Sequence, residues 1–354
     1  MFSAVVVQRQ PCMNNPPETP VCSICGATAR LRYKGHQGYT AGTEFDIYHC
    51  CGCGAAFALP QASPTDVYAL IYANAGDTPG YSRYVAYATA ALSHSAPLDF
   101  LAQSEADYWA IAQQLRKRHP DNRSGVRVLE VGCGLGYLTY ALKQDGFDAS
   151  GIDISELPIR DARLRFGNLF QCSAVADFAE QHAGEYDCII LSEVVEHVGD
   201  IVLFLTQTQR LLRQNGIIIL TTPNRSFFHK TVLWETELPP VHLWWLSEQS
   251  VKVLARQLGL QVSILNLADF YSPQYITKTV RFSHFTPSRQ SIFDARGHLI
   301  PHTNAGSEPV RRRGLSHILK YTGLLRPLRF LRDLSIGRRR CKSRSDVLCA
   351  VLHT

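Results

Sequence analysis

The sequence predicts an α/β fold built around a doubly wound, mostly parallel sheet. Two observations lead to this fold class: short apolar runs alternate regularly with amphipathic runs from residue 126 onward, and the first apolar run ends in a glycine-rich turn. Strands that alternate with helices form parallel sheets covered on both faces. The strands are expected at 126–131, 148–153, 168–173, 187–191, 216–222 and 260–266, and the helices at 137–145, 156–165, 200–213 and 247–257.

The glycine-rich turn is the most informative segment, because its residues predict a nucleotide-type ligand. Residues 128–136 read Val-Leu-Glu-Val-Gly-Cys-Gly-Leu-Gly and connect the first strand to the first helix of the predicted sheet. Glycines let the backbone approach a ligand closely, and the open helix N-terminus offers unpaired N–H groups. The dinucleotide fingerprint requires a further glycine at its sixth position, where this chain has Tyr137. That residue argues against NAD binding.

Acidic residues stand near the ends of the first two predicted strands. Glu130 precedes the glycine turn, and Asp153 ends the second strand, where a carboxylate can accept hydrogen bonds from both ribose hydroxyls. The combination resembles motif I of the class I S-adenosylmethionine-dependent methyltransferases, in which an acidic residue precedes Gly-x-Gly-x-Gly. An ordinary strand-to-helix turn without a ligand is the plainer interpretation, but it leaves the two acidic residues unexplained.

This resemblance implies a Rossmann-like, seven-stranded sheet and S-adenosylmethionine as the methyl donor. It covers residues 126–265, and the apolar run 346–353 resembles the antiparallel strand that closes the sheet in this family. Glu130 would lie near the positive end of the methionine moiety. The family's third strand often ends in Gly-Asp-Ala, whereas this chain has Cys172-Ser173-Ala174, so adenine recognition would depend on backbone groups or Ser173. The expected donor-binding residues are Glu130, Gly132, Cys133, Gly134, Gly136, Tyr137, Asp153, Ile154, Ser173, Ala174 and Ser192.

Two C-x₂-C pairs near the N-terminus predict a structural zinc site. Cys22 and Cys25 form the first pair, Cys50 and Cys53 form the second, and 24 residues separate the pairs. Two such pairs can surround one Zn²⁺ tetrahedrally, and a glycine after each pair permits the tight turn. The alternative is a set of four unligated thiols in a small subdomain. The spacing resembles a zinc ribbon, with four protein ligands and no catalytic role.

A second candidate site follows the strand at 187–191. If a helical turn comes next, Glu193, Glu196 and His197 occupy positions i, i+3 and i+4 on one face at the carboxyl edge of the sheet. Two carboxylates and an imidazole can hold a divalent cation such as Mg²⁺ or Mn²⁺, or supply a general base. In the plainer interpretation Glu193 lines the donor pocket, and the other two residues only stabilise the local structure.

The Glu-x-x-Glu-His stretch resembles the ubiquinone-biosynthesis O-methyltransferases and the small-RNA 2′-O-methyltransferases. In the RNA enzymes these residues bind a metal together with a later histidine, and His242 takes that position here. The resemblance therefore implies Glu193, His197 and His242 as catalytic residues, and Glu193, Glu196, His197 and His242 as candidate cation ligands. The expected reaction is O-methylation of a small-molecule acceptor. An RNA 2′-O-methyltransferase and a donor-binding, non-catalytic zinc-ribbon protein are the alternatives.

Composition and charge bound the remaining expectations. Eleven cysteines without a secretory signal predict a reducing, cytoplasmic environment, and no apolar run reaches eighteen residues. The net charge of +6 is local, because residues 311–344 hold twelve Lys or Arg and one acid. These residues predict basic amphipathic helices that cover the protein's own pocket, with peripheral contact to an anionic membrane as the second interpretation. Few aromatic residues accompany the arginines, which disfavours nucleic acid.

The predicted organisation has five parts. They are a disordered tail (1–20), a zinc ribbon (21–60), a helical segment that covers the substrate (61–124), the methyltransferase core (125–266 with 345–354) and a basic insertion (267–344).

Overall fold

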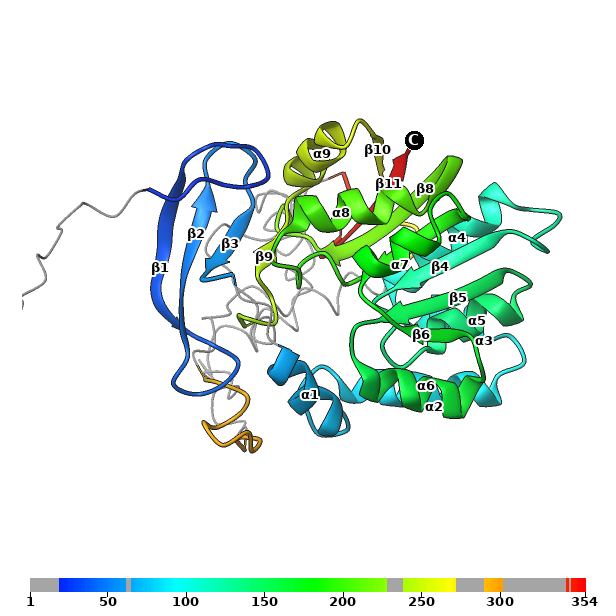
Figure 1. The fold of residues 1–354 in the computed structure, drawn as a ribbon, viewed down its shortest axis with the longest axis horizontal. Coiled ribbons are helices and arrows are strands. Elements are labelled where there is room, and N and C mark those ends of the chain that lie inside the picture. The colour runs from blue at the N-terminus through cyan, green and yellow to red at the C-terminus, as the bar shows by residue number, and fades with distance from the viewer. Residues whose placement is uncertain (1–18, 62–64, 228–237, 272–289, 302–341, 344) are drawn as a thin grey trace, which may run out of the picture.

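The computed structural model describes residues 19–61, 65–227, 238–271, 290–301, 342–343 and 345–354. Within these residues a large sheet carries helices on both faces, and a small sheet of N-terminal strands lies beside it (Figure 1).

The large sheet has seven strands in the order β10-β11-β8-β7-β4-β5-β6. Its strands are β4 (Arg127–Val131), β5 (Asp148–Asp153), β6 (Phe170–Cys172), β7 (Tyr186–Ser192), β8 (Leu212–Pro223), β10 (Gln261–Ile264) and β11 (Val347–His353). The five strands from β4 to β8 pair in parallel, and β11 pairs antiparallel with both β8 and β10. The predicted doubly wound, mostly parallel sheet with an antiparallel final strand is confirmed.

The helices form two layers. They are α1 (Thr65–Ala73), α2 (Ser82–Ser93), α3 (Pro97–Ser104), α4 (Ala106–Arg118), α5 (Tyr137–Gln144), α6 (Glu156–Phe166), α7 (Val175–Gln181), α8 (Ile201–Arg210) and α9 (Glu248–Gln257). Successive strand residues alternate between the layers, as the period of a strand requires. Val128 packs with α2–α6 and Leu129 with α7–α9.

The helices differ from the sequence-based expectation at two points. The sequence analysis did not identify α7, which is short and buries Val175 and Phe178 one turn apart. The helix expected at 200–213 ends at Arg210, because Leu212 already pairs with Tyr186 of β7. Tertiary pairing therefore decides where this helix ends, which the local pattern does not reveal.

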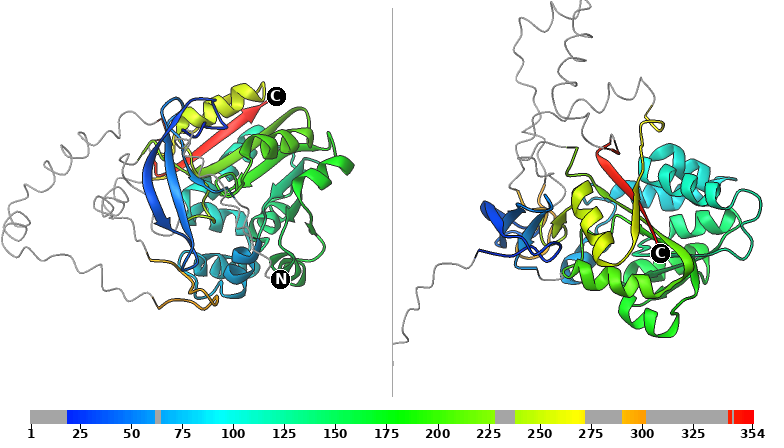
Figure 2. Two further views of the ribbon diagram at one scale, coloured as in Figure 1. Left: turned by 60° about the vertical axis from the view of Figure 1, so that its left-hand side comes forward. Right: turned by 90° about the horizontal axis from the view of Figure 1, so that it is seen from above.

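The small sheet has the order β1-β2-β3-β9, and all its pairs are antiparallel. Three strands come from the cysteine-rich segment: β1 (Ala29–Gln37), β2 (Glu44–Cys50) and β3 (Ala56–Leu59). The fourth strand, β9 (Trp244–Trp245), comes from the segment between β8 and α9. Figure 2 shows from two further directions that the N-terminal strands lie against this part of the core. The sequence analysis did not predict β9.

Several predicted segments fall outside the described residues. These are nearly all of the N-terminal tail and the basic amphipathic stretch up to residue 341. The part of the chain that the structure describes contains no helix that is both long enough and apolar enough to cross a membrane.

Candidate active site and cysteine cluster

The glycine turn between β4 and α5 is held against β5 by backbone hydrogen bonds. The amides of Gly132 and Cys133 both donate to the carbonyl oxygen of Ile152, at 2.8 and 3.0 Å. Gly132 has a φ of +74°, and a Cβ added there would meet Cγ2 of Val194 at 2.6 Å. Glycine is therefore required at this point, because both the backbone angle and the contact exclude a side chain.

Asp153 organises the same turn. Its Oδ2 accepts a hydrogen bond from the Gly134 amide at 3.0 Å, and its Oδ1 accepts one from the Ser155 amide at 2.9 Å. Burial raises the pKa of this carboxyl, and the two amides partly offset that rise. The carboxylate is thus fixed at the carboxyl end of β5, as the sequence analysis predicted.

Glu130 is buried at the base of the turn. The hydroxyl of Thr139 donates a hydrogen bond to its Oε2. Burial raises the pKa of Glu130 to about 8. A carboxyl in this environment carries its proton at neutral pH and ionises readily when a cation comes close.

A cavity of about 560 Å³ opens above the turn. The predicted donor-binding residues that line it are Glu130, Gly132, Cys133, Gly134, Tyr137, Asp153, Ile154, Ser173, Ala174 and Ser192. Gly136 does not line the cavity. A Cβ at Gly136 would meet the Phe170 ring at 2.6 Å and Cβ of Ala162 at 2.8 Å, so this glycine allows α6 and β6 to pack closely.

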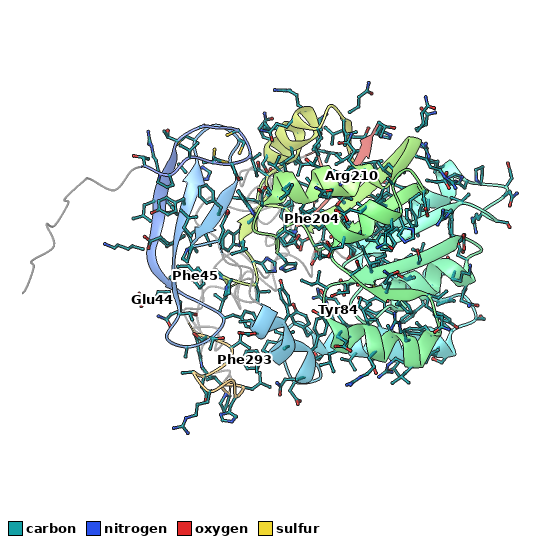
Figure 3. The ribbon with its side chains drawn as sticks, viewed as in Figure 1. Glu44, Phe45, Tyr84, Phe204, Arg210 and Phe293 are labelled. Carbon is teal, nitrogen blue, oxygen red and sulfur yellow. The ribbon has the colours of Figure 1, made fainter. Side chains whose placement is uncertain are left out.

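Tyrosines form much of the opposite wall. Tyr68 and Tyr72 come from α1. Tyr81 directly precedes α2, and Tyr84 lies in its first turn. The rings of Tyr81 and Tyr84 meet edge to face at 5.6 Å. Figure 3 labels Tyr84 and, across the cavity, Phe204 of α8. The sequence analysis predicted a helical segment over the substrate at 61–124 but did not single out these tyrosines, which follow no recognisable motif.

The segment after β7 does not form the expected helical turn. Only residues 195–197 form a turn, and Glu193 has a left-handed backbone with φ of +55°. The prediction that Glu193 shares a face with Glu196 and His197 is therefore wrong. The Glu193 amide donates to the carbonyl oxygen of Thr221 at 3.2 Å, which keeps this residue at the edge of the sheet. Its side chain lines the cavity, and burial beside Glu196 raises its pKa to about 8.

Glu196, His197 and His242 come together beside this cavity. Each offers one ligand atom, and the three atoms lie within 4.8 Å of one another. The two imidazole rings meet edge to face with centroids 4.5 Å apart. Glu193 is not part of this group, so the structure brings together three of the four predicted ligands. We call Glu196, His197 and His242 the EHH group.

The EHH group has the properties of a cation or proton site. Nδ1 of His197 lies 2.7 Å from the carbonyl oxygen of Val241, so Nδ1 donates and Nε2 keeps its lone pair. Burial lowers the pKa of His197 to about 4, which leaves the ring neutral at pH 7. Neither carboxylate oxygen of buried Glu196 has a partner of hydrogen-bond geometry among the described residues. Burial raises the pKa of this carboxyl to about 8. A buried carboxyl in this situation fits a metal ligand.

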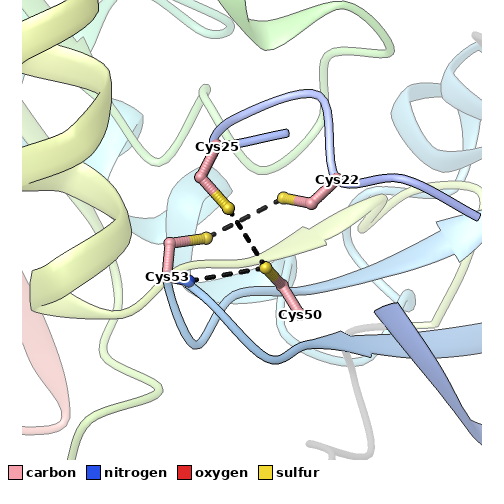
Figure 4. A group of neighbouring side chains, drawn as sticks. All are labelled: Cys22, Cys25, Cys50 and Cys53. Carbon is pink, nitrogen blue, oxygen red and sulfur yellow. Dashed lines mark hydrogen bonds between the residues drawn. The ribbon is translucent and has the colours of Figure 1, made fainter. Parts of the chain in front are cut away.

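The four N-terminal cysteines form a second compact group (Figure 4). Sγ of Cys22 lies 3.8 Å from Sγ of Cys53, and Sγ of Cys25 lies 3.3 Å from Sγ of Cys50. The amides of Gly52 and Cys53 donate to Sγ of Cys50.

The turns around these thiols are tightly fitted. A Cβ at Gly52 would lie 2.8 Å from Cβ of Ala27 and 3.1 Å from Sγ of Cys25. Four mutually facing thiols on two tight turns fit a tetrahedral zinc site.

Comparison with known proteins agrees with this geometry. Residues 103–263 match the family model described as "Methyltransferase domain". Ubiquinone biosynthesis O-methyltransferase of Aromatoleum aromaticum is 37% identical over 112 residues, which cover 29% of this chain and 47% of the relative. The enzyme of the same name from Thiobacillus denitrificans is 35% identical over 120 residues, covering 32% and 52%. This chain thus matches about half the length of these curated relatives.

Among solved structures, a SAM-dependent methyltransferase from Archaeoglobus fulgidus aligns with a TM-score of 0.43 and 15% identity. The alignment covers 69% of this chain and 93% of that one. The matched residues include the glycine turn, Asp153 and all three residues of the EHH group. Residues 103–263 thus form a methyltransferase domain, and part of that domain is similar to the ubiquinone biosynthesis O-methyltransferases.

Proposed function

We propose that this protein transfers a methyl group from S-adenosylmethionine to a hydroxyl oxygen of a small-molecule acceptor. The observation that carries the proposal is the shared cavity, because one space of about 560 Å³ is lined by the glycine turn and Asp153 as well as by His197 and His242. A volume of this size is ordinary for a small-molecule site. The relatives named as O-methyltransferases support oxygen as the acceptor atom.

The donor would lie along the glycine turn. S-adenosylmethionine supplies a methyl group on a positively charged sulfur atom, ready for direct transfer. Asp153 would accept the ribose hydroxyls while its Gly134 hydrogen bond keeps the turn in place. Glu130 would ionise and attract the positive end of the methionine moiety. The backbone near Ser173 and Ala174 would face the adenine, because both residues line the cavity.

The acceptor would lie against the tyrosine wall. Aromatic side chains give a planar ring large contact areas and favourable edge-to-face geometry. Tyr68 and Tyr81 stand on the acceptor side, and Tyr68 also meets His197 edge to face at 6.1 Å. We therefore favour a ring-bearing hydroxyl compound over a long flexible one.

His197 would handle the proton of the acceptor hydroxyl. The Val241 carbonyl accepts from Nδ1, so Nε2 is the ring nitrogen that can take up the proton, and the pKa of about 4 keeps the ring neutral beforehand. Alternatively, the EHH group would hold Mg²⁺ or Mn²⁺, which lowers the pKa of a bound hydroxyl. In that version Nε2 of His197 is a ligand, and Glu196 supplies the negative charge that a hard cation prefers.

We further propose that the four cysteines hold one structural zinc ion. Four protein ligands leave no open position on such a site, which distinguishes it from a catalytic one. The zinc would complete the core of a sheet that is otherwise too small to fold independently.

An acceptor screen tests the function. Purified protein and S-adenosylmethionine are incubated separately with small ring-bearing alcohols and phenols, small aliphatic alcohols and short RNAs, and release of S-adenosylhomocysteine is measured. The proposal expects release with ring-bearing hydroxyl compounds, and release with RNA alone would favour the 2′-O-methyltransferase alternative. Donor binding without turnover on any acceptor would favour the non-catalytic alternative.

A further inference from the structure

Residues 239–247 connect the cysteine sheet to the candidate active site, and we call them the bridge. On one side the bridge pairs with the small sheet, since Trp244 and Trp245 are the partners of Phe57 and Ala56. The Ala58 amide donates to the carbonyl oxygen of Leu243 at 2.9 Å. The bridge thus extends the small sheet by one strand.

The zinc ligands themselves are tied to the bridge. The hydroxyl of Ser247 donates to the carbonyl oxygen of Cys53 at 2.8 Å. The same hydroxyl accepts the Ser250 amide at the start of α9, so its position is fixed from both sides. Any shift of the Cys50–Cys53 turn therefore acts directly on the end of the bridge.

On its other side the bridge contacts residues 196–198, which include Glu196 and His197. The amides of Leu243 and Trp244 both donate to the carbonyl oxygen of Glu196, at 2.8 and 3.1 Å. The indole Nε1 of Trp244 donates a hydrogen bond to the carbonyl oxygen of Val198 at 3.0 Å. The carbonyl oxygen of Val241 accepts a hydrogen bond from Nδ1 of His197. His242 lies in the middle of this segment. Its position relative to Glu196 and His197 is therefore set by the same hydrogen bonds.

The contact between the two sheets is tightly packed. Trp244 and Trp245 are each 1% exposed, and the ring of Phe57 lies 5.3 Å from that of Trp244. Cys22, Cys50 and Cys53 belong to the same buried apolar cluster as Trp244 and Leu191 of β7. Close-packed interiors transmit displacements instead of absorbing them. The cysteine turns and the EHH group are thus the two ends of one continuous packed unit.

We propose that the cysteine site is a positioning element for the active site: metal bound by the four cysteines holds β3, β3 holds the bridge, and the bridge holds His242 against Glu196 and His197. The inference rests on the proposed function only for the catalytic meaning of the EHH group. The mechanical coupling is a separate claim and is tested separately. The hydrogen bonds that hold the bridge do not involve the glycine turn, so donor binding should not depend on the cysteine metal.

Amide hydrogen exchange on the full chain tests the coupling without reference to activity. Zinc-loaded protein is compared with Cys25→Ser, which removes one ligand, and with Cys51→Ser, which changes an exposed cysteine outside the cluster. We expect the Leu243 and Trp244 amides to exchange about tenfold faster or more in Cys25→Ser, because local opening becomes easier. The Gly134 amide should be unchanged, and Cys51→Ser should match the wild type. Faster exchange confined to residues 21–60 would overturn the proposal.

A second pair of variants keeps all the cysteines. Phe57→Leu weakens the contact between β3 and Trp244. Tyr48→Leu removes a ring that stacks on Phe57 but comes from β2, a strand that does not pair with β9. With a responsive acceptor, Phe57→Leu should lower kcat about tenfold with little change in the KM for the donor, as expected for a misplaced catalytic group. Tyr48→Leu should stay close to the wild type. Equal effects of the two substitutions on kcat and on bridge exchange would contradict the proposal. Loss of bridge protection without any turnover in the wild type would leave the coupling established and reject the proposed function.

Discussion

Nδ1 of His197 lies 2.7 Å from the carbonyl oxygen of Val241, although 44 residues separate the two along the chain. This contact joins the turn after β7 to the bridge and decides the tautomer of the imidazole. Because a carbonyl can only accept, Nδ1 carries the proton and Nε2 is left with a lone pair. That nitrogen lies 4.0 Å from Oε1 of Glu196. Backbone carbonyls orient metal-binding and proton-accepting histidines in the same way, through the ring nitrogen that faces away from the metal or the proton.

Replacing either histidine of the EHH group should reduce turnover without weakening donor binding. We expect His197→Ala and His242→Ala each to lower kcat by roughly 100-fold, the usual size of a lost base or ligand. His182→Ala is the control, because His182 pairs with Glu185 and does not line the cavity. Steady-state kinetics and donor titration calorimetry measure both quantities. Full activity in either EHH variant would remove that residue from the catalytic group.

Chelation separates the two versions of the chemistry. If activity falls with a chelator and returns with Mg²⁺ or Mn²⁺, the EHH group acts as a cation site. Activity that resists chelation supports His197 as the base. Zinc content is measured in parallel, because a chelator that strips the cysteine site would confuse the two outcomes.

Asp153→Asn should weaken donor binding while the fold survives. The substitution keeps the size of the side chain but loses the charge that would accept two ribose hydroxyls. The expected loss is about 1.5–3 kcal/mol, the range for charge-assisted hydrogen bonds. Calorimetric titration with S-adenosylhomocysteine measures this change, and an unaltered affinity would place the ribose elsewhere.

The purified protein should contain about one zinc per chain, in line with a site of four cysteine ligands. Cys25→Ser should release it and make residues 21–60 sensitive to protease, because the small sheet has little core of its own. Elemental analysis of protein prepared without chelator makes the measurement, with Cys51→Ser as the variant that should retain zinc. A zinc-free wild type with an ordered sheet would reject the metal site.

The stability of the donor-free protein should fall between about pH 4.5 and pH 8 because of Glu130. Burial raises the pKa of Glu130 from its ordinary value of 4.5 to about 8, so the folded state holds this proton more tightly than the unfolded state. The stabilising contribution is therefore present below pH 4.5 and is lost as the pH rises through about 8. Glu130→Gln should show a smaller fall in melting temperature between about pH 4.5 and pH 8 than the wild type. Parallel melting curves for the two proteins would show that Glu130 does not titrate in this way.

The sequence was sufficient for features that local patterns encode. The strand ending at Asp153 and the turn containing Gly132 follow from apolar periodicity and glycine placement, and both are found as expected. Each C-x₂-C pair predicts a tight turn from its spacing alone, and the structure brings the two pairs together. Such signals lie within a few residues of one another, so no tertiary information is needed.

The remaining features depend on contacts between distant segments. The left-handed backbone of Glu193 depends on hydrogen bonds to Thr221, 28 residues later. Strand β9 forms because Trp244 pairs with Phe57 of the small sheet. A strand of two residues is too short to show an apolar periodicity in the sequence. Tyr81 and Tyr84 reach the cavity only because of how the start of α2 packs over it. His242 was placed beside His197 by resemblance, not by its own sequence context.

The most direct test of the central claim follows a labelled methyl group. S-adenosylmethionine carrying a ¹³C-methyl group is incubated with the wild type and the most responsive hydroxylated acceptor, and the product is analysed by NMR. We predict that the label appears on the acceptor oxygen, and that His197→Ala, which still binds the donor, produces almost none. A label on carbon or nitrogen, or a label that stays on the donor with every acceptor, would contradict the account.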